Sequence, residues 1–220
     1  MSHYSTANLF DFSHTLAAAL FKNSVWPWDV LKNISSFILQ LGPTLSAEVF
    51  ENPAEGVWVA KSAVVAPTAH ISGPCIIDEG AEIRHCAFIR GSAIVGKNAV
   101  VGNSTELKNV VLFDNVQVPH FNYVGDSVLG YKAHMGAGAV TSNVKSDKTP
   151  VAVKAEGGIN TGLKKLGAML GDGVEIGCNS VLNPGTIVGK NSSIYPTSCV
   201  RGVVPPNSIY KTGGQIAAKR

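Results

Sequence analysis

Residues 59–107 read VAKSAV VAPTAH ISGPCI IDEGAE IRHCAF IRGSAI VGKNAV VGNSTE L when they are divided into blocks of six. The first residue of every block is aliphatic, from Val59 to Leu107. The position after it is mostly small or polar, as at Ala60 and Gly96. A period of six fits neither the 3.6-residue repeat of a helix nor the two-residue alternation of an ordinary strand. The stretch therefore indicates a repeat fold in which every sixth side chain enters a shared core.

The same phase returns along most of the remaining chain. After two short steps and one longer break the aliphatic positions continue at Leu112, Val118, Val124, Leu129, Met135, Leu170, Ile176, Leu182, Val188, Ile194 and Val200. Such a repeat predicts a triangular solenoid with one short strand per hexad, three hexads per coil and glycines at corners that need positive φ. We therefore predict an all-β fold, a single-stranded parallel β-helix, over residues 56–210.

Residues 1–55 show a different pattern and are predicted to form an N-terminal helical cap. Residues 16–20 and 28–39 carry the apolar spacing of helices. The Trp-Pro-Trp sequence at 26–28 is typical of a helix entry, because proline is tolerated in the first turn. Since the end of a β-helix is an exposed edge, we expect these helices to cover it.

The hexad phase breaks over residues 142–169, a stretch that contains five lysines. An excursion longer than about 12–15 residues within a regular fold is usually functional or disordered. A basic loop could reach over an anionic ligand, or it could simply be solvated, and composition does not choose between these interpretations. Residues 211–220 are expected to form a tail.

The composition excludes several classes of protein. Charged residues make up 15% of the chain and the formal net charge is +3, which is too weak for a nucleic-acid binder. No apolar run approaches the roughly 20 residues that span a bilayer, and the first residues lack the pattern of a signal peptide. The four cysteines show no CxxC pairing, which is typical of reduced thiols. We expect a cytoplasmic protein that binds neither nucleic acid nor membrane.

The most specific motif begins at His120 and reads HFNYVGDSVLG, followed by Gly-Ala-Gly at 136–138 and Thr-Ser-Asn at 141–143. These motifs resemble the hexapeptide-repeat acyltransferase superfamily, above all the acetyltransferase domain of bifunctional N-acetylglucosamine-1-phosphate uridyltransferases and its archaeal sugar-1-phosphate relatives. The resemblance covers residues 85–210. It implies a left-handed β-helix, a homotrimer with active sites between subunits, and acetyl-CoA as the acyl donor with no metal required.

The resemblance also implies roles for individual residues. His120 corresponds to the catalytic base, and the sugar phosphate would be bound by Arg90, Lys108, Tyr123 and Asn143. An amino sugar arrives as an ammonium, which must lose a proton before its nitrogen can attack a thioester. A neutral imidazole is a suitable proton acceptor near pH 7. Arginine and lysine donors match the charge of a sugar phosphate.

Further positions correspond to the coenzyme and to a loop lysine of the family. The coenzyme would contact Ala137, Cys178 and Pro196, and a backbone N–H in a glycine-flanked turn can stabilise the oxyanion of the intermediate. The family pattern has Ser at Cys178, Ala at Pro196 and Asn at His134, which leaves the acyl donor and the exact sugar open. The candidates for the loop lysine are Lys148, Lys164 and Lys165.

The resemblance thus implies an N-acetyltransferase for an amino-sugar 1-phosphate, glucosamine-1-phosphate or galactosamine-1-phosphate, in the synthesis of nucleotide sugars such as UDP-N-acetylglucosamine for cell-wall or surface glycans. One alternative is a non-catalytic or sugar-nucleotide-binding relative of a UDP-N-acetylglucosamine pyrophosphorylase. Another is a β-helical carbonic anhydrase, which needs three histidines around a metal, whereas His120 and His134 lack an evident third partner. We expect no nucleotidyltransferase activity, because no glycine-rich phosphate loop is found.

Overall fold

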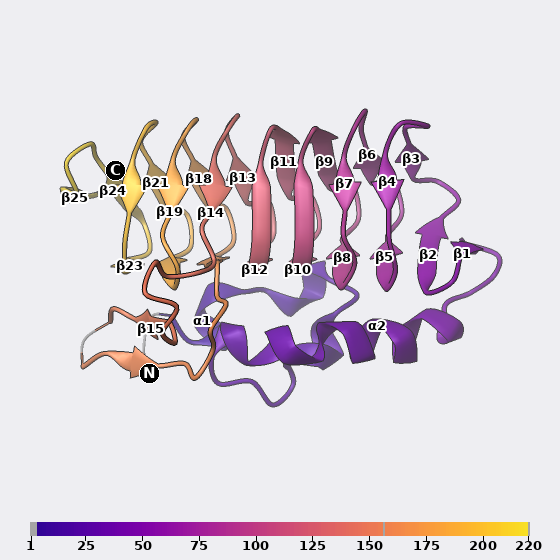
Figure 1. Cartoon of the computed structure of the whole chain (residues 1–220), viewed down its shortest axis with the longest axis horizontal. Helices are drawn as coiled ribbons and strands as arrows, with labels where there is room; N and C mark the ends of the chain where they lie inside the picture. The colour runs from indigo at the N-terminus through magenta and orange to yellow at the C-terminus, as the bar shows by residue number, and fades with distance from the viewer. Residues whose placement is uncertain (1–3, 156, 220) are drawn as a thin grey trace.

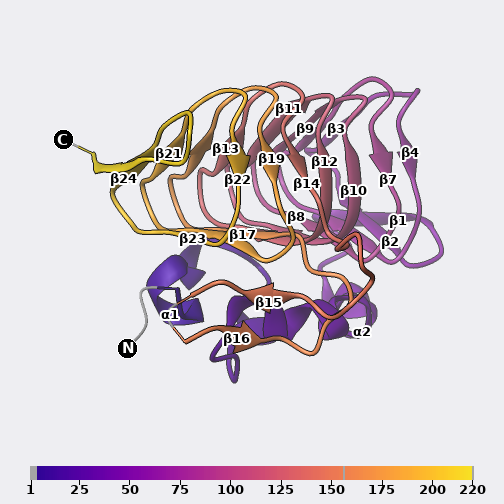
Figure 2. The ribbon, with the colours of Figure 1, turned by 60° about the vertical axis from the view of Figure 1, so that its left-hand side comes forward.

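The chain folds as a parallel β-helix with helical segments along one side (Figure 1). The computed structural model describes residues 4–155 and 157–219. About 8 coils stack along the long axis, and the predicted left-handed parallel β-helix is confirmed. Figure 2 shows the coils from an oblique angle, with each strand lying beside the corresponding strand of the coil before it.

Three columns of parallel strands form the faces of the prism. The first face consists of β2 (Val57–Ala60), β5 (Cys75–Ile77), β8 (Ala93–Val95), the ends of β10 and β12, β17 (Ala168–Leu170), β20 (Thr186–Val188) and β23 (Val203–Val204). The second consists of β3 (Val64–Val65), β6 (Glu82–Ile83), β9 (Val100–Asn103), β11 (Gln117–His120), β13 (His134–Met135), β18 (Glu175–Ile176), β21 (Ser193–Ile194) and β24 (Ser208–Tyr210). The third consists of β4 (His70–Ile71), β7 (Phe88–Ile89), the beginnings of β10 (Glu106–Leu112) and β12 (Tyr123–Leu129), β14 (Val140–Thr141), β19 (Val181–Leu182) and β22 (Cys199–Val200).

The corner between the third and first faces is tighter in the coils of β10 and β12. Glu106 pairs with Tyr123, which is 123 − 106 = 17 residues on rather than the 18 of three full hexads, and the pairing continues around the corner. Asn109 and Asp126 sit at this corner with φ of 55° and 49°, a left-handed conformation that Asn and Asp tolerate better than other side chains. The two short steps in the repeat therefore mark the corner that carries Lys108.

The hexad positions fill the interior as predicted. From Ile77 to Val200 the aliphatic side chains that begin the hexads are at most 3% exposed. Val65, in the first coil, is 37% exposed because no further coil covers it on that side. Thr141 is a polar exception in the interior, and its hydroxyl accepts a hydrogen bond from the backbone N–H of Gly125 at 2.9 Å.

The outward side of the first face is apolar as well. Side chains next to the inward ones on a strand point to the opposite side of the sheet. On this face they are nevertheless buried, at 1% exposure or less: Ile76, Ile94, Val111, Val128, Met169 and Ile187. Their burial requires another layer of structure over the first face.

The N-terminal segment supplies that layer, which corrects the predicted cap over the open end. Helix α2 (Ile34–Leu41) packs on β5, β8 and β10, and η3 (Pro27–Asn33) packs on β12, so both lie along the prism (Figure 1). The apolar outer first face offers more surface to bury than the end of one coil. The remaining elements of this segment are α1 (Thr6–Leu9), η1 (Phe12–His14), η2 (Ala18–Phe21), η4 (Gly42–Thr44) and β1 (Phe50–Ala54). Within the described residues, every helix is too short or too polar to cross a bilayer.

Polar contacts fasten the beginning of the segment to the coils. The carboxylate of Asp172 accepts the backbone N–H of Asp11 at 2.8 Å and that of Tyr131 at 2.9 Å. The Lys190 ammonium lies 2.9 Å from the same carboxylate. The ring of His14 stacks on Tyr131 with centroids 3.7 Å apart. The segment is therefore anchored to the corner between the first and second faces.

The excursion after β14 folds into a hairpin of its own. Strands β15 (Ala152–Val153) and β16 (Ile159–Asn160) pair antiparallel, and Figure 2 shows them on the side of the prism where α1 and α2 lie. Val151 and Val153 are buried and belong to the hydrophobic core. At the other end of the chain, β25 (Ile216–Ala218) folds back antiparallel onto β24, so part of the predicted tail is a strand.

Asp78 is a buried carboxyl whose charged form is poorly compensated. Its side chain is 2% exposed, Oδ1 accepts the backbone N–H of Glu79 at 2.8 Å, and Oδ2 has no hydrogen-bond partner in the described part of the chain. Burial raises the pKa of Asp78, because desolvation disfavours the carboxylate.

We expect Asp78→Asn to increase the free energy of unfolding at pH 7 and to change it less near pH 3. A carboxyl whose folded pKa is raised binds more protons in the native state, so its ionisation destabilises the fold as the pH rises past the unfolded value near 3.8. Urea unfolding at both pH values measures the effect. The control is Asp147→Asn, which should destabilise at pH 7 because hydrogen bonds from Thr149 lower the pKa of Asp147. A loss of stability at pH 7 in Asp78→Asn would contradict the expectation.

Candidate active site

His120 ends β11 at the corner between the second and third faces, and its side chain is exposed. Its backbone is held on both sides: the N–H donates to Asn122 Oδ1 at 3.1 Å, and the carbonyl accepts the N–H of Gly138 at 3.0 Å. No group within the described residues hydrogen bonds its imidazole. The ring is therefore fixed at its base and free at its nitrogens, as a proton acceptor for a ligand must be.

Asn122 locks the turn that carries His120. Its side chain is 2% exposed, and Nδ2 donates to the carbonyls of Gly136 and Ala139 at 2.9 and 3.0 Å. Together with the bond from His120, these contacts satisfy the buried amide and tie the turn to the next coil. Asn122 belongs to the motif that begins at His120, but sequence reasoning assigned it no role.

Gly102 supports the same turn from the preceding coil. A Cβ at Gly102 would lie 1.5 Å from the carbonyl oxygen of Pro119, the residue before His120. We expect Gly102→Ala to displace strand β11 and to lower the free energy of unfolding by about 3 kcal/mol or more. Because β11 carries His120, the variant should also reduce the acetyl-transfer activity that the sequence predicts. Urea unfolding and turnover measure the two effects.

The control for this prediction is Gly162→Ala. No atom lies within 4 Å of a Cβ at Gly162, and its φ is +69°, so this variant carries only the backbone strain of about 1–2 kcal/mol. Equal losses in Gly102→Ala and Gly162→Ala would show that the contact with Pro119 has no effect of its own.

The predicted coenzyme residues follow His120 along the same corner. The carbonyl of Ala137 accepts the N–H of Asn179, and the carbonyl of Cys178 accepts the N–H of Thr197. Ala137, Cys178 and Pro196 therefore lie on adjacent coils. Within the described residues the N–H of Ala137 donates no hydrogen bond, so this amide is available to a ligand.

Three of the predicted sugar-phosphate residues meet around Asp126, which is 3% exposed. The Lys108 ammonium lies 3.2 Å from Asp126 Oδ1, and Asn143 Nδ2 donates to Oδ2 at 2.6 Å. Asn109 Nδ2 donates to Oδ1 at 2.9 Å. Asn143 also donates to the hydroxyl of Tyr123 at 3.2 Å. Asp126 thus holds Lys108, Asn143 and, through Asn143, Tyr123 in one cluster.

Arg90 stands one coil before Lys108 and is paired with a carboxylate. Its Nη1 lies 2.7 Å from Glu106 Oε1, and the hydrogen bond to Glu106 raises the pKa of Arg90. Arg90 and Lys108 are thus balanced by Glu106 and Asp126. A phosphate at this corner would have to compete with these carboxylates for the two cations.

Tyr123 lies on the outside of the third face, between the two corners. Burial raises the pKa of Tyr123, so its hydroxyl stays protonated at neutral pH and can donate a hydrogen bond. The third face also exposes apolar side chains, with Phe88 40%, Val181 38% and the neighbouring Phe121 61% exposed. His120 and the Asp126 cluster therefore border one partly apolar face from its two edges.

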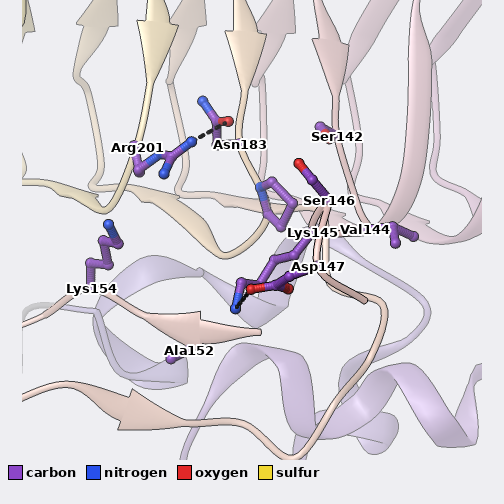
Figure 3. A pocket seen from close by; sticks show the side chains of 10 residues that line it. Ser142, Val144, Lys145, Ser146, Asp147, Ala152, Lys154, Asn183 and Arg201 are labelled. Carbon is purple, nitrogen blue, oxygen red and sulfur yellow. Dashed lines mark hydrogen bonds and ion pairs between the residues drawn. The ribbon is translucent and has the colours of Figure 1, made fainter. Parts of the chain in front are cut away.

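The excursion presents lysines other than the three candidates. Lys148, Lys164 and Lys165 are exposed and do not line the pocket that the excursion forms against the coils. Lys145 and Lys154 do line it (Figure 3). The positions of these side chains depend on how the hairpin folds, and the spacing of the hexads does not predict that fold.

His134 lies on the second face, where its Nδ1 is 2.8 Å from Glu175 Oε2. It therefore sits one face away from the Asp126 cluster. In the described part of the chain, no three side chains of His, Cys, Asp or Glu come together in a way that could hold a metal ion.

The chain is similar in sequence to several known proteins. Residues 71–163 match the family model described as GMPPB C-terminal domain. A bifunctional protein GlmU from Methanococcus maripaludis is 33% identical over 197 residues, which cover 88% of this chain and 48% of that protein. The chain is a relative of the GlmU-like bifunctional proteins.

The chain is also similar to two further proteins. A bifunctional sugar-1-phosphate nucleotidylyltransferase/acetyltransferase from Sulfurisphaera tokodaii is 36% identical over 109 residues, covering 49% of this chain and 27% of that protein. The acetyltransferase domain of PglB from Neisseria gonorrhoeae aligns with a TM-score of 0.35 and 15% identity over 80% of this chain and 62% of that one. The chain spans about half the length of the GlmU-like relatives, so the activities of those whole proteins bear on it only as a proposal.

Proposed function

We propose that this protein is an acetyl-CoA-dependent N-acetyltransferase for an amino-sugar 1-phosphate, either glucosamine-1-phosphate or galactosamine-1-phosphate. The observation that carries the proposal is the placement of His120. Its unengaged imidazole lies at one edge of the third face, and the Asp126 cluster of Lys108, Asn143 and Tyr123 lies at the other. The similarity to GlmU-like proteins supports the same chemistry.

His120 would act as the general base. The amine of the sugar must be neutral to attack the thioester carbonyl, and His120 would accept the proton that the nitrogen loses as the new C–N bond forms. The free N–H of Ala137 lies one coil away on the same corner and would donate to the oxyanion of the tetrahedral intermediate. The intermediate then expels the coenzyme as a thiolate, which takes up a proton.

The Asp126 cluster would position the sugar phosphate. The Tyr123 hydroxyl and the Lys108 ammonium supply donors of the kinds that bind sugar and phosphate oxygens, and Asn143, whose Nδ2 is engaged, supplies Oδ1 as an acceptor for a sugar hydroxyl. Arg90 would contribute if the phosphate displaced Glu106 from it. Because Asp126 holds Lys108 and Asn143 before any ligand binds, the cluster is preorganised.

The third face would form the contact between subunits of a homotrimer. Exposed Phe88, Phe121 and Val181 border the site residues on this face, and apolar surface of this kind is commonly buried in an interface. A neighbouring subunit would then close the site over His120 and Tyr123. Sedimentation of the intact chain measures the assembly state.

Release of coenzyme A in the presence of a panel of acceptors tests the proposal. The panel comprises glucosamine-1-phosphate, galactosamine-1-phosphate, unphosphorylated glucosamine and UDP-glucosamine. We expect release with one or both sugar 1-phosphates well above that with the other acceptors. Cys86, Cys178 and Cys199 are exposed thiols, so coenzyme A should be quantified by chromatography rather than by a thiol reagent.

Two outcomes would overturn the proposal. One is release no faster than the hydrolysis of acetyl-CoA alone with every acceptor. The other is tight binding of a sugar nucleotide without acetyl transfer, which would favour the sugar-nucleotide-binding alternative. The absence of nucleotidyltransferase activity stays a prediction, tested by adding UTP and measuring pyrophosphate.

A further inference from the structure

A pocket of about 290 Å³ opens between the excursion and the last coils, at the corner between the third and first faces. Residues from four places line it: the beginning of the excursion, strand β15 with the residue after it, the turn after β19 and the turn after β22. Figure 3 shows Lys154 and Arg201 on one side and the pair of Lys145 and Asp147 on the other. Asn183 lies beside Arg201.

The charges in this pocket are not balanced. Lys145 and Asp147 neutralise each other, with Nζ 3.2 Å from Oδ2. Arg201 Nη2 donates to Asn183 Oδ1 at 3.3 Å, a neutral partner that leaves its charge uncompensated. Within the described residues neither Arg201 nor Lys154 forms an ion pair. The pocket thus holds two free cations, unlike the corner where Arg90 and Lys108 are paired.

The fold builds this pocket through a close approach of the hairpin to the coils. Val153 at the end of β15 is buried, whereas the next residue, Lys154, is exposed and lines the pocket. Gly202 has a φ of +92°, and a Cβ there would lie 3.3 Å from the Cβ of Lys154. Gly185 lies one coil before Gly202, and a Cβ at Gly185 would lie 2.8 Å from Val151 Cγ1. These glycines let β15 lie against the turn that presents Arg201.

The two cations of the pocket lie apart from Lys108, although Ser142 and Val144 at one end of the pocket flank Asn143 of the Asp126 cluster. From β10, which carries Lys108, the strands pair in the order β12, β14, β19 and β22. Four steps of about 4.8 Å place the turn of Arg201 roughly 19 Å from Lys108 along the prism. A single phosphate cannot contact both residues.

We propose that this pocket is a second phosphate-binding site, in which Arg201 and Lys154 bind a phosphate group of an organic phosphate. Arginine supplies a planar pair of donors that matches two phosphate oxygens, and lysine adds a mobile point charge. The hydroxyls of Ser142 and Ser146 line the same pocket and are further donors. The phosphate could belong to a nucleotide or to coenzyme A, since both carry phosphate groups that these side chains can bind.

Isothermal titration calorimetry on the full chain separates these sources with three probes: inorganic phosphate, UDP and coenzyme A. We expect at least one probe to bind the wild type, and Arg201→Gln and Lys154→Gln each to weaken that binding by tenfold or more. If the variants lose affinity for UDP alone, the ligand of the pocket is a nucleotide. If they lose affinity for coenzyme A alone, the ligand is coenzyme A. Loss for inorganic phosphate alone identifies a simple phosphate ester.

The matched control is Arg84→Gln. Arg84 is an exposed arginine on the second face, paired with Glu82 at 2.8 Å, and its removal should leave binding of every probe unchanged. Thermal unfolding of each variant checks that the fold is retained. Failure of the wild type to bind any probe, or equal affinities in the wild type and both pocket variants, would overturn the proposal. Equal affinities leave the acetyl-transfer proposal unaffected, and a wild type that binds no probe but releases coenzyme A from acetyl-CoA in the acceptor assay would overturn the pocket alone.

Discussion

Replacing His120 with alanine is expected to lower kcat/KM for acetyl transfer by about 10²–10⁴-fold, the range that general-base catalysis contributes. The imidazole is exposed and forms no hydrogen bond or ion pair within the described residues, so its removal breaks no polar contact of the fold. The loss should therefore fall on kcat, while KM for the sugar phosphate changes little because the Asp126 cluster is intact. Steady-state kinetics of the purified variant measure both parameters.

His85→Ala is the matched control for this result. His85 lies on the same corner two coils earlier, with its side chain also exposed, and Nδ1 is 2.6 Å from the Thr68 hydroxyl. We expect this variant to keep the wild-type kcat. Unchanged kcat in His120→Ala, or equal losses in the two variants, would remove His120 from the chemical step.

Phe113→Ala is expected to lower the free energy of unfolding by about 3–5 kcal/mol, the cost of truncating a large buried aromatic side chain. Phe113 is fully buried and follows β10 at the end of the first face. Its ring packs against Phe10, Phe12 and Phe21, with centroids 5.1, 6.2 and 5.7 Å away. The truncation would leave a cavity where the N-terminal segment meets the coils.

Urea unfolding at a fixed protein concentration measures this loss, and limited proteolysis shows where the structure opens. We expect cleavage to appear first in the N-terminal segment, because Phe113 contributes one side of its aromatic cluster. Leu39→Ala is the control, since Leu39 lies on α2 and is 51% exposed, so its truncation should cost little. A loss below about 1 kcal/mol in Phe113→Ala would show that the N-terminal segment does not depend on this contact.

The interior of the β-helix was predictable because each coil repeats one local rule. Inward positions such as Ile77 and Leu182 recur at fixed spacing, and their burial follows from the repeat alone. The place of the N-terminal segment did not follow from that rule. The sequence did carry a sign of where this segment packs. On every third strand a second apolar residue, such as Ile76 or Ile94, stands beside the inward-pointing one. An apolar residue at this outward position indicates that another layer of structure packs on that face.

The site divides in a similar way. The positions of His120 and Lys108 came from a resemblance over a short motif, and the structure places both at corners of the third face. Asp126 and Asn122 had no predicted role, because their importance lies in contacts across coils that sequence spacing does not show. Within the excursion, folding of the hairpin decides which lysines face the coils, so Lys145 and Lys154 could not be selected from composition.

Transfer of the acetyl group to nitrogen can be observed directly in the product. Acetyl-CoA labelled with carbon-13 at the acetyl carbonyl is incubated with nitrogen-15 glucosamine-1-phosphate, or with the galactosamine isomer, and the wild-type protein. The expected result is a carbon-13 amide signal split by one-bond coupling to nitrogen-15, growing with time and absent in His120→Ala. Labelled acetate alone, or an acetyl ester carbon without nitrogen coupling, would contradict N-acetylation of the sugar phosphate.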